Sequence, residues 1–429
     1  MRRALVLAAL LAACKADLHH TTDANAPGVP GDTLAPSIGD PPPGAVTLTV
    51  TRLGQPMPDV AVFFQNADSS LVGASLTNAK GLAWAAMTPG GFVTAVEHKG
   101  SGVDELSTFA AVEPGDALAL DVEPVGPRDQ VTFALTFPDA AAASYAIYTP
   151  CGSMHAAATT VAFTGTGCAN LVDFVIVPLD GQGTPAGPAL SAPSTAIDAP
   201  AVALTGAYQP FAATTFAYTS VPASWQFIGL YHAISAERRA YEQSGGTAPS
   251  STVAALQLAL PWTAASTLTV TTQFPTTSEL GRQQIYNWQP ASTVYVLDLG
   301  SVQLAPYASA PAYDRTARVV SWTEGTGAQG DVVRARLHLY RDDIPAGRTW
   351  TWRIAAPRTA TSVAYPQLPV LDFDFNAQPS DTLSIDELTT IQVPGGYAGF
   401  RAHAYGDPML GVTGASGRMV IQTAFSREL

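Results

Sequence analysis

Apolar and polar residues alternate with a period of two in many stretches from residue 46 onward. Val46, Leu48 and Val50 alternate with threonines, and Val60, Val62 and their neighbours repeat the period. Such alternation is typical of strands with one buried face. Turn residues interrupt the N-terminal stretches about every eight to twelve positions. The pattern therefore predicts an all-β chain.

The expected strands fall into groups that suggest domains. They are residues 46–50, 60–64, 74–77, 81–87, 91–96, 118–122, 131–137, 144–148, 171–177, 214–218, 268–274, 294–299, 332–340, 349–354, 397–403 and 419–424. Only residues 235–243 have a pattern typical of a helix, with Ser235 as the N-cap. We predict domains at 45–124, 128–287 and 288–429, where the last two form either two units or one.

Three short motifs in the first of these domains resemble a known family. They are G-x-P at 54–56, T-N-A-K-G-L-A at 77–83 and P-G-G at 89–91. In them the chain resembles bacterial Ig-like and carboxypeptidase-regulatory-like (transthyretin-like) domains. The resemblance implies an N-terminal Ig-like β-sandwich that acts as a spacer or adhesion module. We expect one or two larger antiparallel β-sandwich domains to follow it.

The first 14 residues have the pattern of an export signal. Two arginines precede a short apolar segment at 4–10, and Leu11-Ala12-Ala13-Cys14 follows. This segment is too short to span a bilayer, and small residues before a cleavage point mark a secretory signal peptide. Its ending resembles the lipobox of bacterial lipoproteins, which implies removal of residues 1–13 and lipid attachment to Cys14. The alternatives are an ordinary signal peptide and a buried apolar N-terminus.

Residues 14–44 are rich in proline and glycine, which predicts an extended tether between the lipid and the folded part. Acyl chains hold a protein at a membrane because each buried CH₂ contributes about 0.8 kcal/mol. We therefore expect an extracytoplasmic protein, lipid-anchored at the outer membrane or cell surface. The membrane is its predicted partner through that anchor.

Cysteine usage agrees with export. The chain has three cysteines, and Cys151 and Cys168 remain once Cys14 is assigned to the lipid. An even pair in an exported chain predicts a disulfide, since disulfides persist outside the cytosol. The alternatives are two free buried thiols, or half of a metal site that lacks histidines at ligand spacing.

Charge is scarce and mostly negative. Charged residues make up 13% of the chain, and 34 acidic residues against 21 basic ones give a net charge of −13. This balance opposes nucleic-acid binding, which needs a basic surface. The sequence has no HExxH, GxSxG or phosphate-loop motif, so we predict no catalytic residues and no cofactor.

The charge balance reverses locally between residues 315 and 358, where eight arginines accompany four acidic residues. The strands at 332–340 and 349–354 predict a hairpin there. The candidate ligand-binding residues are Arg334, Arg336, His338, Trp350 and Trp352. Side chains two apart leave a strand face roughly 6–7 Å apart, so the arginines suit a carboxylate or sulfate and a tryptophan supplies stacking. The alternative is a solvated sheet face with both tryptophans in the core.

Asp372, Asp374 and Asn376 form a candidate metal site. Their spacing resembles the start of a calcium loop, because Ca²⁺ takes several oxygen ligands. The sixth position of that loop holds Ala377 instead of glycine, and the twelfth holds Leu383 instead of glutamate. The alternative is a strand whose aromatic residues point inward.

Together these features predict an exported, lipid-anchored cell-envelope protein that acts as a binding or structural module. Its expected partner is a surface glycan or another protein. The alternative is a secreted hydrolase of carbohydrate or peptide with an Ig-like accessory domain in front. A deep acidic cleft within 128–429 favours the hydrolase, and flat sheet faces favour binding.

Overall fold

The computed structural model describes residues 34–426 except 53–54, 101–102, 123–129, 150, 167, 169, 211, 221–227, 235–240, 248–252, 261–265, 275–279, 290–293, 299, 301–307, 325–329, 343–346, 371, 394 and 404–418. The predicted signal peptide, Cys14 and the first part of the tether lie outside these residues. Within them the chain is all-β, with strands β1–β29 and one helix, α1. No described helix has the length and apolarity needed to cross a bilayer.

The N-terminal strands are β1 (Val46–Arg52), β2 (Gln55–Pro56), β3 (Ala61–Gln65), β4 (Leu71–Leu76), β5 (Leu82–Ala85), β6 (Gly91–Gly100), β7 (Val103–Val112) and β8 (Ala117–Val122). The next are β9 (Gln130–Thr136), β10 (Ser144–Thr149), β11 (Gly152–Ala156), β12 (Thr160–Thr166), β13 (Leu171–Leu179), β14 (Leu190–Ala196) and β15 (Ala201–Ala203). Then follow β16 (Ala212–Thr219), β17 (Ile228–Ile234), β18 (Tyr241–Thr247), β19 (Val253–Leu260), β20 (Ser266–Phe274), β21 (Leu280–Gln289) and β22 (Val294–Asp298). The last are β23 (Ala308–Asp314), β24 (Val319–Glu324), β25 (Val332–Arg341), β26 (Arg348–Pro357), β27 (Ser362–Ala364), β28 (Thr382–Gln392), α1 (Gly396–His403) and β29 (Met419–Ser426).

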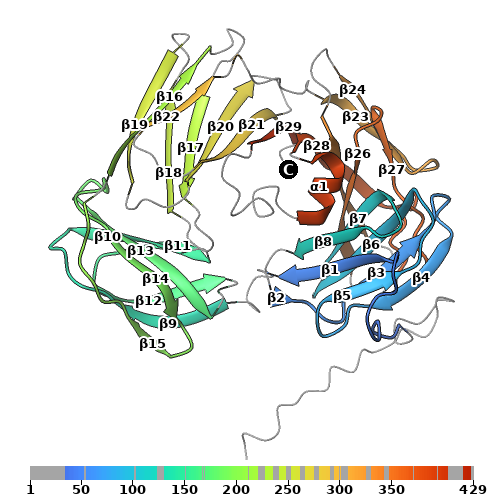
Figure 1. The fold of residues 1–429 in the computed structure, drawn as a ribbon, viewed down its shortest axis with the longest axis horizontal. Coiled ribbons are helices and arrows are strands. Elements are labelled where there is room, and N and C mark those ends of the chain that lie inside the picture. The colour runs from blue at the N-terminus through green and yellow to red at the C-terminus, as the bar shows by residue number, and fades with distance from the viewer. Residues whose placement is uncertain are drawn as a thin grey trace, which may run out of the picture.

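A 12-stranded sheet runs through the molecule in the order β18-β17-β20-β21-β29-β28-β25-β26-β7-β6-β3-β4 (Figure 1). Its β26 and β7 pair in parallel, so strands from the two ends of the chain share one sheet. This grouping differs from the predicted boundaries, which placed 45–124 and 288–429 in separate units. The described pairs are mostly antiparallel, but β1–β8, β9–β15, β16–β22 and β7–β26 are parallel.

Other layers cover both faces of the sheet around β25 and β26. On one face the four-stranded sheet of β1, β2, β5 and β8 packs its apolar side chains, such as Leu48, against Phe109 and Ala355. On the other face the sheet of β23, β24 and β27, together with the segment that follows it, packs against Trp350 and Trp352. This part of the molecule is therefore a three-layer β structure.

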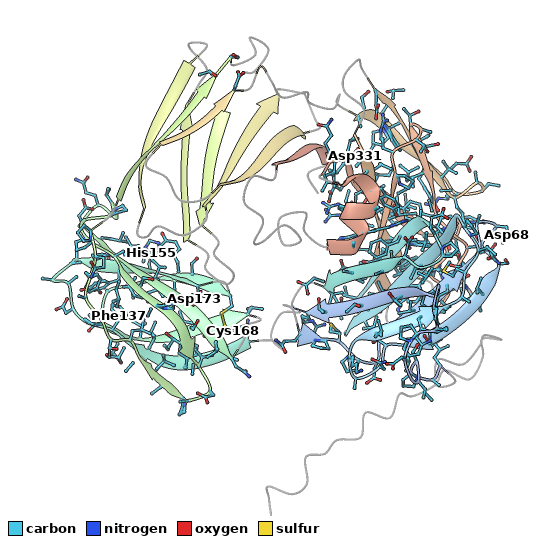
Figure 2. The ribbon with its side chains drawn as sticks, viewed as in Figure 1. Asp68, Phe137, His155, Cys168, Asp173 and Asp331 are labelled. Carbon is cyan, nitrogen blue, oxygen red and sulfur yellow. A yellow bond between two sulfur atoms is a disulfide. The ribbon has the colours of Figure 1, made fainter. Side chains whose placement is uncertain are left out.

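Strands β9–β15 form a sandwich of their own. The sheet β11-β10-β13-β14 packs against β12-β9-β15. Phe133, Phe163 and Phe174 pack against one another in its core, with ring centroids 5.4–6.1 Å apart. Figure 2 places Cys168 and Asp173 in this sandwich, whereas Asp331 lies in the three-layer part.

The helix α1 corrects the strand predicted at its position. Tyr397, Phe400 and Arg401 are spaced as on one face of a helix. The Tyr397 hydroxyl donates to the Ala110 carbonyl over 2.6 Å, and Arg401 Nη2 lies 2.6 Å from an Asp116 carboxylate oxygen. The period of this segment is helical, and contacts with the sheets fix it as a helix.

The helix predicted at 235–243 is wrong where it can be compared with the structure. Residues 235–240 lie outside the described residues, and residues 241–243 belong to β18. This strand pairs with β17 over its whole length. Sheet pairing therefore outweighs the local preference of this segment.

The end of the predicted tether lies along β4, the edge strand of the large sheet. Pro36 forms a parallel bridge with Leu76, and the backbone amide of Ser37 donates to the Leu76 carbonyl over 3.1 Å. Leu34 packs against the core beneath. These contacts cover part of an otherwise open sheet edge.

Candidate functional site

The predicted hairpin at 332–354 forms as β25 and β26. Its register pairs Arg336 with Arg353 and His338 with Thr351. Strand β28 pairs with β25 on one side, and β7 pairs with β26 on the other. We call the polar side of these four strands the charged face; it comprises Glu105, Arg334, Arg336, His338, Tyr340, Thr349, Thr351, Arg353, Thr382, Ser384, Asp386 and Glu387.

Trp350 and Trp352 do not lie on the charged face, which corrects the predicted binding site. Their side chains are 0% and 1% exposed. The register pairs Trp350 with Leu339 and Trp352 with Leu337, so the tryptophans share the face of the leucines. Trp352 Nε1 donates to the Thr108 hydroxyl over 2.9 Å. The site therefore lacks its predicted tryptophans, and the alternative that places them in the core is right.

Carboxylates of neighbouring strands hold most cations of the charged face. Arg334 Nη2 lies 2.6 Å from Glu387 Oε1. Arg353 and Lys99 both form ion pairs with Glu105. These pairs offset the repulsion between arginines on adjacent strands.

Glu387 is held in its charged form. Burial alone would raise the pKa of this carboxyl group, but the nearby Arg334 guanidinium and a hydrogen bond from the Thr389 hydroxyl outweigh it. The pKa of Glu387 falls to about 2. The Thr389 hydroxyl donates to Glu387 Oε1 over 2.7 Å.

Arg336 is held much more loosely than its neighbours. Its Nε lies 4.0 Å from Asp386 Oδ2, and its Nη1 lies 4.0 Å from Glu387 Oε2. The buried Nε has no hydrogen-bond partner, although the side chain as a whole is 33% exposed. Next along the strand, His338 is half-buried and Tyr340 is 41% exposed. The charged face is therefore open around these three residues.

The candidate calcium ligands are used within their own segment. Asp374 Oδ1 accepts hydrogen bonds from the backbone and side-chain amides of Asn376 over 3.0 Å and 2.7 Å. The Asn376 side chain also hydrogen-bonds the backbone of Leu368 at both its oxygen and its nitrogen. Asp372 faces His98 closely enough to raise the pKa of that histidine. The part of the chain that the structure describes contains no group of three His, Cys, Asp or Glu side chains arranged for a metal.

A guanidinium lies where the sequence suggested a calcium ion. Arg341 donates to the backbone carbonyls of Asp374 and Asn376 over 2.9 Å and 3.0 Å. Its Nε and Nη2 donate to the two carboxylate oxygens of Asp381 over 2.6 Å and 2.8 Å. The Trp350 ring centroid is 5.1 Å from Arg341 Cζ. The calcium prediction is therefore replaced by an arginine that organises the same segment.

Sequence reasoning missed His98, which had no motif around it. His98 Nδ1 lies 2.6 Å from Asp104 Oδ1, and Arg348 Nε donates to Asp104 Oδ2 over 2.6 Å. The hydrogen bond to Asp104 raises the pKa of His98 above its usual range. Burial raises the pKa of Asp104, but its hydrogen bonds with His98 and Arg348 outweigh burial and lower it. Its partner Asp104 lies in β7, a strand that the alternation of apolar and polar residues did not predict.

A hollow of about 450 Å³ lies in the β9–β15 sandwich, apart from the charged face. Residues 140–143, small residues at 186–188 and Tyr208 line it. Asp180 also reaches this hollow, but one of its carboxylate oxygens accepts the backbone amides of Gln182 and Thr184. The lining is mostly alanine, glycine and proline, which suits packing better than acid–base chemistry.

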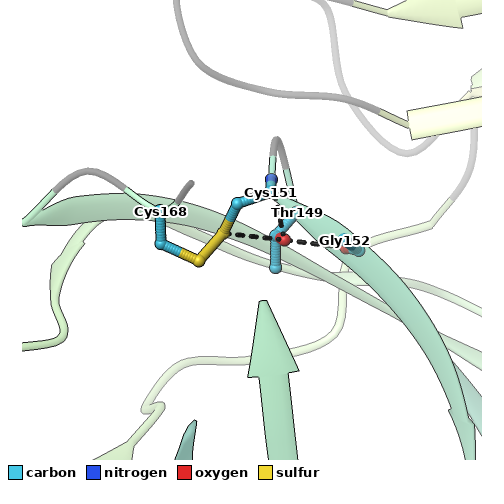
Figure 3. The surroundings of a disulfide bond; sticks show 4 residues. All are labelled: Thr149, Cys151, Gly152 and Cys168. Carbon is cyan, nitrogen blue, oxygen red and sulfur yellow. Dashed lines mark hydrogen bonds between the residues drawn. A yellow bond between two sulfur atoms is a disulfide. The ribbon is translucent and has the colours of Figure 1, made fainter. Parts of the chain in front are cut away.

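The predicted disulfide between Cys151 and Cys168 is confirmed (Figure 3). The Cys151 amide donates to the Thr149 hydroxyl, which donates in turn to the Gly152 carbonyl over 2.7 Å. A side chain at Gly165 would collide with Cys168 Sγ, so glycine makes room for the bond.

No protein-family model and no curated protein matches the chain. Among solved structures, the Bacillus anthracis TIE protein is 10% identical over 59% of this chain and 50% of that chain, with a TM-score of 0.17. The FN1-FN3 domains of chicken CNTN1 are 10% identical over 58% of this chain and 83% of that chain, with a TM-score of 0.15. The chain spans half the length of the first of these proteins. At these TM-scores neither likeness carries an argument.

Proposed function

We propose that this chain is an exported, lipid-anchored cell-envelope protein whose all-β part acts as a binding or structural module. The observation that carries the proposal is that two of the three cysteines form a disulfide and the third lies in the predicted lipobox. Cys151 and Cys168 are bonded to each other, which leaves Cys14 in Leu11-Ala12-Ala13-Cys14. A disulfide suits an oxidising compartment outside the cytosol, and lipid on Cys14 would hold the protein at the outer membrane or cell surface.

The charged face supports a binding or structural role over the hydrolase alternative. A glycosidase needs a carboxylic acid that keeps its proton, so its pKa must be raised. Glu387 has the opposite property, because Arg334 overcomes its burial and lowers its pKa to about 2. Glu105 forms ion pairs with Arg353 and Lys99. These carboxylates serve as counter-charges on the charged face.

The anchor is tested by replacing the lipidated cysteine. In cells grown with labelled fatty acid, the wild-type chain should take up label and enter the detergent-rich phase. Cys14→Ser should remove both properties. The double variant Cys151→Ser, Cys168→Ser is the matched control, since it removes the other two cysteines, and with them the disulfide, but keeps the lipobox. Unchanged membrane partitioning of Cys14→Ser would overturn the proposal.

A further inference from the structure

We propose that the open end of the charged face binds an acidic saccharide through Arg336, His338 and Tyr340. This inference rests on the proposed role as a binding module and names the class of its ligand. It retains the predicted arginine and histidine but replaces the buried tryptophans with an exposed tyrosine on the same face.

The register of the sheet arranges the three side chains in one row. Alternate residues of a strand leave the same face roughly 6–7 Å apart, so the row extends over about 13 Å. Strand β26 places Thr349 and Thr351 beside Tyr340 and His338. Strand β28 places Thr382 and Ser384 on the other side of the same two residues. The row is therefore flanked by hydroxyl groups, which both donate and accept hydrogen bonds.

The charge of this surface favours an anion. The charged face holds three arginines and three carboxylates, and Lys99 of the adjoining strand β6 adds a fourth cation, whereas the neighbouring pair of Arg52 and Glu97 adds no net charge. The cations are Lys99, Arg334, Arg336 and Arg353; the carboxylates belong to Glu105, Asp386 and Glu387. A surplus positive charge thus remains, although the whole chain carries −13.

Arg336 is the cation of this surface that lacks a close carboxylate. Arg334 has a carboxylate oxygen at 2.6 Å, whereas the carboxylates nearest to Arg336 are 4.0 Å away. Its buried Nε also lacks a hydrogen-bond partner. The exposed part of this guanidinium is therefore available to donate to an incoming carboxylate.

Exposed apolar surface at the opposite end of the row from Arg336 favours a saccharide over a simple anion. Tyr340 is 41% exposed and Val103 is 43% exposed. Thr349 pairs with Tyr340 in β25 and with Val103 in β7, so the three lie in adjacent strands at one level of the sheet. Together they form a platform for the apolar side of a sugar ring. The surrounding hydroxyls suit sugar hydroxyls, and Arg336 suits an acidic substituent.

The test is calorimetric titration of the full chain, purified in detergent, with trigalacturonate. Arg336→Ala should weaken binding by about tenfold or more, because it removes the charge and the donors that face the carboxylate of the ligand. Arg336→Lys should recover part of the affinity, since it keeps the charge but loses the planar fork. Tyr340→Ala should also weaken binding. Lys80→Ala, which removes an exposed cation elsewhere, should leave affinity unchanged.

Two probes decide the ligand class. The methyl ester of trigalacturonate should bind weakly, and a hexaglutamate peptide should bind less well than trigalacturonate. Equal binding of the ester would overturn the role of the carboxylate, and equal binding of the peptide would overturn the saccharide class. Failure of wild-type protein to bind trigalacturonate would overturn the inference alone, because the anchor is tested separately through Cys14→Ser.

Discussion

Arg336 and Arg341 lie five residues apart in β25 on opposite faces of the sheet, and their surroundings differ sharply. Arg341 has four hydrogen bonds to oxygen atoms, two of them to the Asp381 carboxylate. Arg336 has its nearest carboxylate oxygens at 4.0 Å. One strand therefore supplies a structural arginine on its covered face and an arginine available to a ligand on its open face.

The difference follows from the cost of removing a charge from water. A buried guanidinium is tolerated only when its N–H donors are satisfied and its charge is paired. Arg341 meets both conditions, and the carbonyls that it binds fix residues 374–376 against the sheet. Arg336 is partly exposed to water, so its charge does not need a close carboxylate within the protein.

The largest expected effect comes from breaking the buried pair. Asp381→Asn should lower the free energy of unfolding by about 3–5 kcal/mol, because it leaves the Arg341 charge uncompensated in the core. Denaturation in urea measures this loss. Asp342→Asn is the matched control, since Asp342 is exposed, and it should change stability little. A loss below about 1 kcal/mol for Asp381→Asn would contradict the structural role of Arg341, because a loss of that size is typical of an exposed ion pair.

A smaller loss is expected on the charged face. Glu387→Gln should cost about 2 kcal/mol, because Arg334 loses its close counter-charge. The pKa of Glu387 is lowered from 4.5 to about 2 on folding. Its contribution is therefore full above about pH 4.5 and disappears as the pH falls towards 2. Unfolding experiments at pH 7 and pH 3 should thus show the wild-type advantage shrinking in acid; a constant advantage would contradict this account.

His98 should stabilise the fold only in a window of pH. Its folded pKa is raised from 6.5, so its contribution is present below that value and is lost as the pH rises through the folded pKa. The pKa of Asp104 is lowered from 3.8, so its contribution is lost in strong acid. His98→Gln should therefore lower the thermal midpoint at pH 5.5 but hardly at pH 9. The effect should stay within about 1 kcal/mol, since His98 is half exposed, and an equal loss at both pH values would argue against it.

The smallest effect on stability is expected at Arg336 itself. Arg336→Ala removes no ion pair closer than 4.0 Å. The free energy of unfolding should stay within about 0.5 kcal/mol of the wild type, as for other surface substitutions. Urea denaturation should be measured for Arg336→Ala and Arg341→Ala together. The Arg341→Ala variant should lose several times more free energy of unfolding than Arg336→Ala. Similar losses for the two variants would remove the distinction between them.

Alternation along the chain predicted the β25–β26 hairpin and the shared face of Arg334, Arg336 and His338. It did not predict that Trp350 and Trp352 turn to the other face. Alternation assigns residues to two sides of each strand, but the register between strands decides which sides coincide. A shift by one residue would have exposed the tryptophans.

Other features had no local signal. Strand β7 is buried on both faces along most of its length, so it lacks the alternation that reveals half-exposed strands. Its pairing with β26 places strands of the predicted units 45–124 and 288–429 in one sheet. The oxygens of Asp374 and Asn376 suggested calcium because nothing nearby in the sequence points to Arg341. By contrast, cysteine parity and the export signal expected in the first 14 residues were sufficient to predict the disulfide.

The most direct test of the account is arginine modification by phenylglyoxal, followed residue by residue with mass spectrometry. Arg336 should react rapidly and Arg341 slowly in the folded protein, and both should react alike after unfolding. Saturating trigalacturonate should protect Arg336 and leave the slow rate of Arg341 unchanged. Equal rates for the two arginines in the folded protein, or no protection of Arg336, would contradict the division into a structural and an available arginine.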